Sequence, residues 1–288
     1  MKKIKLLYYN GKNFGDALSP FIVSQITHNK HIIQKSRKII FKKYYIKHII
    51  INLLQGNFKS IKSILLPNEK NLIAIGSVLS LGNKYSDIWG AGFMNENEQF
   101  HGGNVYALRG KFSYNKIKKF GTFHCEAFGD PGMLLPLYIK PISQKKYKLG
   151  IIPHFKETQV FQKEYPNYKI IDLNTTNIKE TVEEITQCHY ILSTSLHGII
   201  VAHSYGIPAL WIKKGEIDTD GFKFKDYFSS VDIETYEGIK DFNDYIVNDK
   251  WMELFERHNL QSLPQKDISI IQKELLECFP KKYIQNEK

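Results

Sequence analysis

The stretch 190-YILSTSLHGIIVAHSYGIP-208 decides the fold class of this chain. Its first residues are apolar and indicate the end of a buried strand, and residues 196–205 carry apolar side chains at helical spacing. Gly206-Ile207-Pro208 then ends the helix and leads into another apolar run. The polar triplet at residues 193–195 therefore lies at a strand-to-helix turn, the connection typical of a parallel α/β sheet.

Turns of this kind lie at the carboxyl ends of strands, where open α/β sheets bind their ligands. The helix that follows begins with unpaired backbone N–H groups and with the positive end of its dipole, so the expected ligand is an anion. Ser195, Leu196, His197 and Gly198 lie at this helix start and are candidate binding residues. For His197 we favour a ligand-facing role, and for His203, further along the helix, a structural one.

Strand-like and helix-like patterns alternate along the rest of the chain, which favours parallel sheets with right-handed crossovers. The pattern at residues 37–54 does not distinguish a helix from a strand. The predicted strands are residues 5–9, 71–78, 88–93, 105–108, 148–152, 169–173, 190–192 and 209–212. The predicted helices are residues 17–27, 111–119, 178–188, 196–205 and 267–279.

A polar segment with one proline, 141-PISQKK-146, separates two such series and is the best candidate for a linker. The sequence therefore predicts an α/β protein of two Rossmann-like domains, residues 1–143 and 144–250. Residues 251–288 are predicted to form C-terminal helices that can pack back on the first domain.

The composition indicates a globular protein with a basic surface. Of the 288 residues 42% are hydrophobic, which is ample for packed cores, and 40 Lys and Arg against 29 Asp and Glu give a net charge of +11. Two explanations of this charge have equal weight: the surface binds an anionic partner, or the chain simply has a Lys-rich composition bias. No nucleic-acid-binding motif is present, so we expect no nucleic-acid partner.

The cysteines and the N-terminal residues predict a cytoplasmic protein. Cys125, Cys188 and Cys278 are widely separated and have no metal-ligand spacing, so neither a disulfide framework nor a metal site is expected. The first apolar run breaks at Asn10-Gly11-Lys12, before the hydrophobic segment of a signal peptide would form, and no apolar run is long enough for a membrane span.

A second strand-to-helix turn, Asn13-Phe14-Gly15-Asp16, follows the first predicted strand. Asp16 is either the N-cap of the next helix, which would contribute about 1 kcal/mol, or a carboxylate that faces a cleft and takes a proton from a ligand hydroxyl. We give the two roles equal weight. Asn13 and Gly15 belong to the same candidate site.

Three cations are candidate contacts for a phosphate or a carboxylate. Arg109 follows a predicted strand directly, and a guanidinium binds such groups in a bidentate fork, although a surface Arg is an equal alternative. Lys223 and Lys225 alternate with aromatic residues at positions 221–228, and this segment is either a surface helix or a source of phosphate-binding cations.

Several short motifs together resemble those of the polysaccharide pyruvyl transferase family. The resemblance covers most of the chain, and it rests on the order and spacing of its parts. These parts are 13-NFGDAL-18, 88-IWGAGF-93, 108-LRG-110, 128-FGDPG-132, 193-STSLHG-198 and 206-GIP-208.

The resemblance implies a fold similar to the GT-B glycosyltransferases, with two Rossmann-like domains that face a cleft. It also implies transfer of the enolpyruvyl unit of phosphoenolpyruvate onto a sugar of a bacterial surface polysaccharide or its lipid-linked precursor, as a ketal. In that reaction His197 would be the general acid, Asp16 the base, and Arg109 and Lys223 would bind the donor. Phosphoenolpyruvate is the donor substrate, and no cofactor or metal is implied.

One position departs from the family pattern. Many relatives carry Arg directly before the Leu-His pair, where this chain has Ser195, so either a lysine substitutes for it or the donor differs. The candidate substitutes are Lys213, Lys214, Lys223 and Lys225. The rival functions are a GT-B glycosyltransferase with a nucleotide-sugar donor and a non-catalytic carbohydrate-binding or assembly protein, with peripheral contact to the anionic inner face of a membrane as a further prediction.

Overall fold

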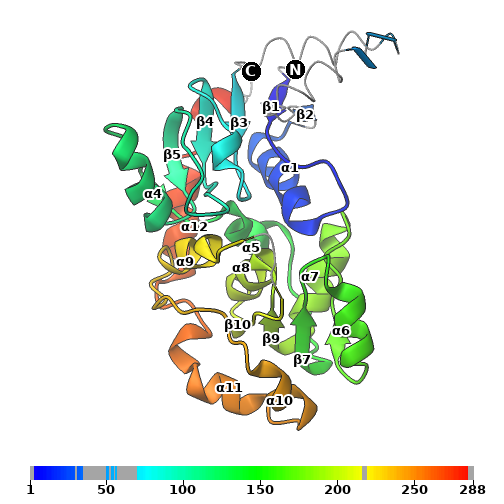
Figure 1. The fold of residues 1–288 in the computed structure, drawn as a ribbon. Coiled ribbons are helices and arrows are strands. Elements are labelled where there is room, and N and C mark those ends of the chain that lie inside the picture. The colour runs from blue at the N-terminus through cyan, green and yellow to red at the C-terminus, as the bar shows by residue number, and fades with distance from the viewer. Residues whose placement is uncertain are drawn as a thin grey trace.

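The computed structural model describes residues 3–29, 31–34, 50–51, 53–54, 56, 70–215 and 219–284. These residues form two parallel sheets with helices packed around them, which confirms the predicted α/β class. The first sheet lies in the upper half of Figure 1 and the second in the lower half, with α5 (Leu135–Tyr138) and α8 (Leu196–Ser204) between them. The undecided segment at residues 37–54 lies largely outside the described residues.

The first sheet has the strand order β2-β1-β3-β4-β5-β6, and its described strands are all parallel. Its strands are β1 (Ile4–Leu6), β2 (Ile32–Gln34), β3 (Asn71–Ile73), β4 (Ser86–Trp89), β5 (Asn104–Leu108) and β6 (Ala127–Phe128). Helix α1 (Phe14–Thr27) follows β1, and α4 (Lys111–Ile117) follows β5. The 3-10 turn η3 (Pro131–Leu134) follows β6 and leads towards the second sheet.

The second sheet has the order β10-β9-β7-β8 and is again parallel. Its strands are β7 (Tyr147–Ile152), β8 (Lys169–Ile170), β9 (Cys188–Ser193) and β10 (Ala209–Trp211). The helices that follow them include α6 (Thr158–Glu164), α7 (Ile178–Thr186), α8 and α9 (Phe222–Phe228). The strand-turn-helix predicted at residues 190–205 is thus present as β9 and α8.

One predicted helix start is wrong. Helix α1 begins at Phe14, and its N-cap is Asn13, whose side-chain oxygen accepts a hydrogen bond from the Asp16 backbone N–H at 3.2 Å. Asn13 is extended and three residues before Asp16, which is the geometry that a capping side chain needs. Asp16 therefore lies in the first helical turn, where its carboxylate is favoured by the helix dipole and is not needed as a cap.

A continuous apolar cluster joins the two sheets. It contains Leu18 of α1, Met133 of η3 and Ile200 of α8, all fully buried. Helix α8 and the turn η3 pack against each other, and η3 in turn packs on α1. The start of α8 is therefore held in a defined position relative to the first turn of α1.

The chain crosses back to the first sheet at its end. Helices α10 (Phe242–Val247) and α11 (Met252–Arg257) pack on the second sheet, whereas α12 (Ile268–Glu277) packs on β6 (Figure 1). The indole N–H of Trp89 in β4 donates to the Leu275 carbonyl at 2.8 Å. This helix therefore covers part of the first sheet.

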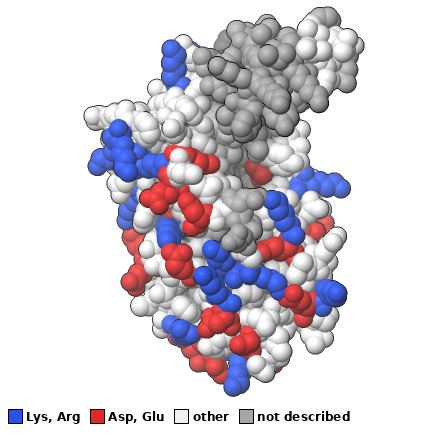
Figure 2. Space-filling view, in the orientation of Figure 1, with Lys and Arg blue, Asp and Glu red and all other residues white. Residues whose placement is uncertain are grey.

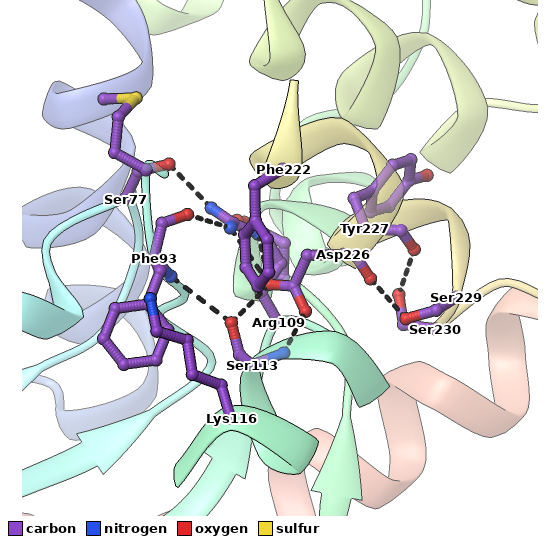
Figure 3. Close-up of polar contacts among 12 residues, drawn as sticks. Ser77, Phe93, Arg109, Ser113, Lys116, Phe222, Asp226, Tyr227, Ser229 and Ser230 are labelled. Carbon is purple, nitrogen blue, oxygen red and sulfur yellow. Dashed lines mark hydrogen bonds and ion pairs between the residues drawn. The ribbon is translucent and has the colours of Figure 1, made fainter. Parts of the chain in front are cut away.

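A buried ion pair connects β5 to α9 (Figure 3). The Arg109 Nε donates to Asp226 Oδ2 at 3.0 Å, and both side chains are fully buried. The remaining guanidinium nitrogens donate to Ser77 Oγ at 2.7 Å and to the Phe93 carbonyl at 2.5 Å. Asp226 also accepts hydrogen bonds from the Ser113 N–H and hydroxyl, both at 2.7 Å, so the two charges are satisfied on all sides.

We expect Asp226→Asn to destabilise the protein by about 3 to 5 kcal/mol, because it leaves the Arg109 charge buried without a counter-charge. Urea unfolding should show this as a lower midpoint. The matched control is Lys111→Ala, which breaks the exposed Lys111–Asp232 pair and should cost at most about 1 kcal/mol. Equal shifts of the midpoint in both variants would contradict a stabilising role for the buried pair.

Candidate functional site

A cavity of about 470 Å³ lies at the carboxyl ends of strands from both sheets. The turns after β1, β3, β7 and β9 all reach it, as expected for a ligand site in open parallel sheets. The first half of the chain contributes Tyr9, Asn13, Asp16, Gly76, Ser77 and Glu98, among others. The second half contributes His154, Lys156, Ser195, Leu196, His197 and Lys223, among others.

Six of the ten residues predicted from the sequence line this cavity together: Asn13, Asp16, Ser195, Leu196, His197 and Lys223. They come from three separate segments, α1, α8 and α9, that the fold brings to one place.

The two predicted glycines have packing roles beside the cavity. A Cβ on Gly15 would lie 2.1 Å from His197 Nδ1, so only glycine lets this backbone approach the ring. A Cβ on Gly198 would lie 2.5 Å from the Ser193 hydroxyl, so this glycine allows α8 to pack closely on β9.

The start of α8 is open to an anion. Ser195 is the N-cap residue with φ −106° and ψ 131°, but its side chain makes no capping hydrogen bond. Its own N–H donates to the Ser193 hydroxyl at 2.9 Å, which fixes the turn. The first N–H groups of a helix have no partner within the helix, so here they and the helix dipole are available to a ligand.

The His197 ring is mostly buried, with 16% of the side chain exposed. Its Nε2 lies 3.8 Å from Asp130 Oδ2, and burial lowers its pKa to about 3, helped by the positive charges of Arg109 and Lys223. The ring is therefore neutral at physiological pH. An anionic ligand would offset the two cations and raise this pKa.

Asp130 was not predicted as a site residue, although it belongs to a quoted motif. It is fully buried beneath the cavity, and its Oδ1 accepts a hydrogen bond from the Gly132 N–H at 2.8 Å. Burial raises its pKa to about 6, against the lowering effect of this hydrogen bond and of Arg109. A carboxyl group with this pKa can gain or lose a proton close to neutral pH.

Lys223 and Lys225 have different surroundings although they are two residues apart on α9. Lys223 is 7% exposed and lines the cavity, whereas the Lys225 ammonium pairs with Glu237 outside it. Of the four lysines considered as substitutes for the family arginine, Lys223 is the one that lines the cavity; Lys214 pairs with Glu164.

Lys156 is a cation that the sequence interpretation missed. It follows β7 and lines the cavity beside His154 and Phe155. No pattern distinguishes it from the other lysines of this Lys-rich chain, so only the fold identifies it.

Arg109 does not line the cavity. Its guanidinium is fully buried, and it reaches the lining only through its hydrogen bond to Ser77. Its predicted direct contact with a ligand stays a prediction.

His203 has the structural role that the sequence favours. It is 1% exposed, and its Nδ1 lies 3.0 Å from the Tyr227 hydroxyl. Its Nε2 lies within hydrogen-bond distance of the Ala209 and Ser262 carbonyls. Burial lowers its pKa to about 4, so the ring is neutral in the folded protein.

Three wider properties of the described residues bear on function. They contain no group of three or more His, Cys, Asp and Glu placed to hold a metal ion. No helix among them has the length and apolarity that crossing a bilayer requires. Figure 2 shows that Lys and Arg on one face are interspersed with Asp and Glu.

The site can be compared with known proteins. A family model described as polysaccharide pyruvyl transferase matches residues 7–213. Of the cavity-lining residues named above, Lys223 is the one that lies outside this match. An uncharacterized protein of Acanthamoeba polyphaga mimivirus is 31% identical over 171 residues, which span 56% of this chain and 60% of that protein. The match thus covers less than two thirds of the relative's length. No solved structure matches.

The pH dependence of the free energy of unfolding should show that His197 is neutral in the folded protein. Because its folded pKa, about 3, lies below the unfolded value, the unfolded chain binds the proton first, and His197 destabilises the fold as pH falls through about 6.5 towards 3. We expect His197→Gln to make the loss of stability between about pH 6 and pH 4 shallower, by up to about 1.4 kcal/mol per pH unit. Urea unfolding at several pH values measures this slope.

The exposed His189 is the control, and His189→Gln should leave the slope as in the wild type. A slope that is the same in the His197 variant and the wild type would mean that the ring is not held neutral by its surroundings.

Proposed function

The chain belongs to the polysaccharide pyruvyl transferase family, and we propose that it transfers the enolpyruvyl unit of phosphoenolpyruvate to a sugar of a bacterial surface polysaccharide or its lipid-linked precursor. The observation that carries this proposal is the placement of His197 at an uncapped helix start, in one cavity with Asp16 and the buried Lys223. This arrangement offers an anion site and two groups for proton transfer. The two sheets with a cavity at their carboxyl ends also support a GT-B-like arrangement.

The donor would be held by charge. Phosphoenolpyruvate carries about three negative charges, which suit a helix start and flanking ammonium groups. The N-terminus of α8, Lys223 and Lys156 supply these in the cavity. We propose that Arg109 acts on the donor through its charge and through the Ser77 hydroxyl that it holds, and that Lys223 replaces the arginine for which this chain has Ser195.

The reaction needs one proton to be added to the donor and one to be removed from each of two sugar hydroxyls. Protonation of the donor's methylene carbon makes its neighbouring carbon electrophilic, and a sugar hydroxyl attacks that carbon and loses its proton. The C–O bond to phosphate then breaks, and a second hydroxyl closes the ketal. One hydroxyl proton replaces the proton that the methylene carbon gained when it became a methyl group. The other leaves with phosphate, so no redox partner is consumed.

We assign the proton donor to His197 and the base to Asp16, which line the same cavity. The imidazole is neutral at physiological pH, so it becomes an acid only when the bound donor's negative charge offsets Arg109 and Lys223. Donor binding would thereby raise the pKa of His197 and allow the ring to act as a general acid. The cytoplasmic location and the contact with an anionic membrane remain predictions from the sequence.

A nucleotide-sugar glycosyltransferase is the second candidate, and one observation favours it. Ser195 leaves the helix start without the family's arginine, and a helix start of this kind also suits a diphosphate. The architecture would be the same, and only the donor would differ.

Thermal unfolding with ligands separates the two candidates. We expect phosphoenolpyruvate to stabilise the protein by about 2.7 kcal/mol at one hundred times its dissociation constant, with inorganic phosphate weaker and nucleotide sugars without effect. The rise in melting temperature is the measurement. Stabilisation by a nucleotide sugar alone would overturn the pyruvyl-transfer proposal in favour of the second candidate.

Two neighbouring lysines test the donor site. Lys223→Met should raise the KM for phosphoenolpyruvate by about tenfold or more, because a charge-assisted contact of about 1.5 to 3 kcal/mol is lost. Lys225→Met is the matched control, since its ammonium pairs with Glu237, and it should leave KM unchanged. Steady-state kinetics over a range of donor concentrations gives both values. An unchanged KM in the Lys223 variant would remove this residue from the donor site.

A further inference from the structure

Two buried polar atoms face each other below the cavity without a hydrogen bond. Asp130 Oδ2 and His197 Nε2 are 3.8 Å apart, and neither atom has a hydrogen-bond partner among the described residues. Buried polar atoms in folded proteins are almost always paired, so two such atoms at this distance are natural partners for each other. A shift of less than an ångström would form the bond.

The Asp130 carboxylate is held so that its Oδ2 points at the His197 ring. Its other oxygen, Oδ1, accepts the Gly132 N–H at 2.8 Å at the start of η3. The side chain is fully buried, and η3 packs on both α1 and α8. Asp130 caps η3 with this one oxygen, so capping does not explain why Oδ2 is buried as well.

The Nδ1 side of the ring lies beside the first turn of α1, at a glycine whose missing side chain leaves space there. Gly15 lies so close that a Cβ there would be 2.1 Å from Nδ1. Nε2 is buried, whereas the ring as a whole lines the cavity. Nδ1 is therefore the nitrogen left to serve a ligand.

We propose that Asp130 is the positioning residue of His197: its carboxylate accepts the proton on Nε2, so that Nδ1 presents its lone pair to the cavity. This inference rests on the proposed function, because it states how the proton-transferring ring of that reaction is oriented. The dyad fixes one tautomer and one ring orientation. It also places a negative charge where it stabilises the imidazolium that forms during turnover.

Asp130→Asn tests the dyad with little change in shape. The amide oxygen can keep the hydrogen bond to the Gly132 N–H, and the amide NH₂ then takes the place of Oδ2 and donates to Nε2. The proton of the neutral ring must then move to Nδ1. We expect ¹⁵N NMR of histidine-labelled protein at neutral pH, without substrate, to show the Nε2–H tautomer in the wild type and the Nδ1–H tautomer in the variant.

His197→Gln identifies the signal of this ring in the spectra. Asp267→Asn is the matched control, because Asp267 is also an N-cap aspartate but lies on α12, and it should leave the tautomer unchanged. In assays of pyruvyl transfer, kcat should fall by about 10²- to 10⁴-fold in Asp130→Asn, with little change in the KM for the donor.

The two proposals fail in different ways. A wild-type ring that carries its proton on Nδ1, or a tautomer that is the same in Asp130→Asn, overturns the role of Asp130 whatever the activity. The wild-type spectrum alone decides this if the variant does not fold. The expected tautomers together with a wild-type protein that transfers no pyruvyl group would leave the dyad in place and overturn the proposed function.

Discussion

The buried ion pair between Arg109 and Asp226 is the interaction on which the arrangement of the site depends. Two charges removed from water are tolerated only when each is compensated, and here Ser77, Phe93 and Ser113 complete their hydrogen bonds. Because the pair joins β5 to α9, it fixes α9 against the first sheet. Lys223 lies one helical turn before Asp226 and is thereby directed to the cavity.

The same pair contributes to the electrostatics around His197. Burial lowers the pKa of His197, and Arg109 and Lys223 lower it further, whereas burial raises the pKa of Asp130 against the lowering effect of Arg109. The imidazole of His197 is therefore neutral at physiological pH. An anionic ligand beside the ring would offset these positive charges and raise the pKa of His197.

Packing between the sheets places the first turn of α1, which carries Asp16, beside the His197 ring of α8. Leu18, Met133 and Ile200 belong to one apolar cluster, so α1 and α8 cannot move independently. Gly15 removes the side chain that would separate the first turn of α1 from the His197 ring. The separation of α1 from the His197 ring is thus set by a core contact and by the missing Cβ of Gly15.

The sequence by itself determined the local structure and much of the site. The apolar periods at residues 190–205 and the polar turn between them identify β9, α8 and the start of α8, because these depend on neighbours in sequence. Asp16 was wrongly considered as a cap since both it and Asn13 are capping types, and only the backbone conformation of Asn13 decides between them.

Tertiary structure decided what depends on residues far apart in the chain. Lys223 and Lys225 look equivalent in the sequence, but residues two apart on a helix face different ways, and the Arg109 pair sets which one meets the cavity. Arg109 proved to be buried because its partner lies 117 positions later. Asp130 meets His197 only because η3 packs on α8, a contact between distant segments that no local pattern records.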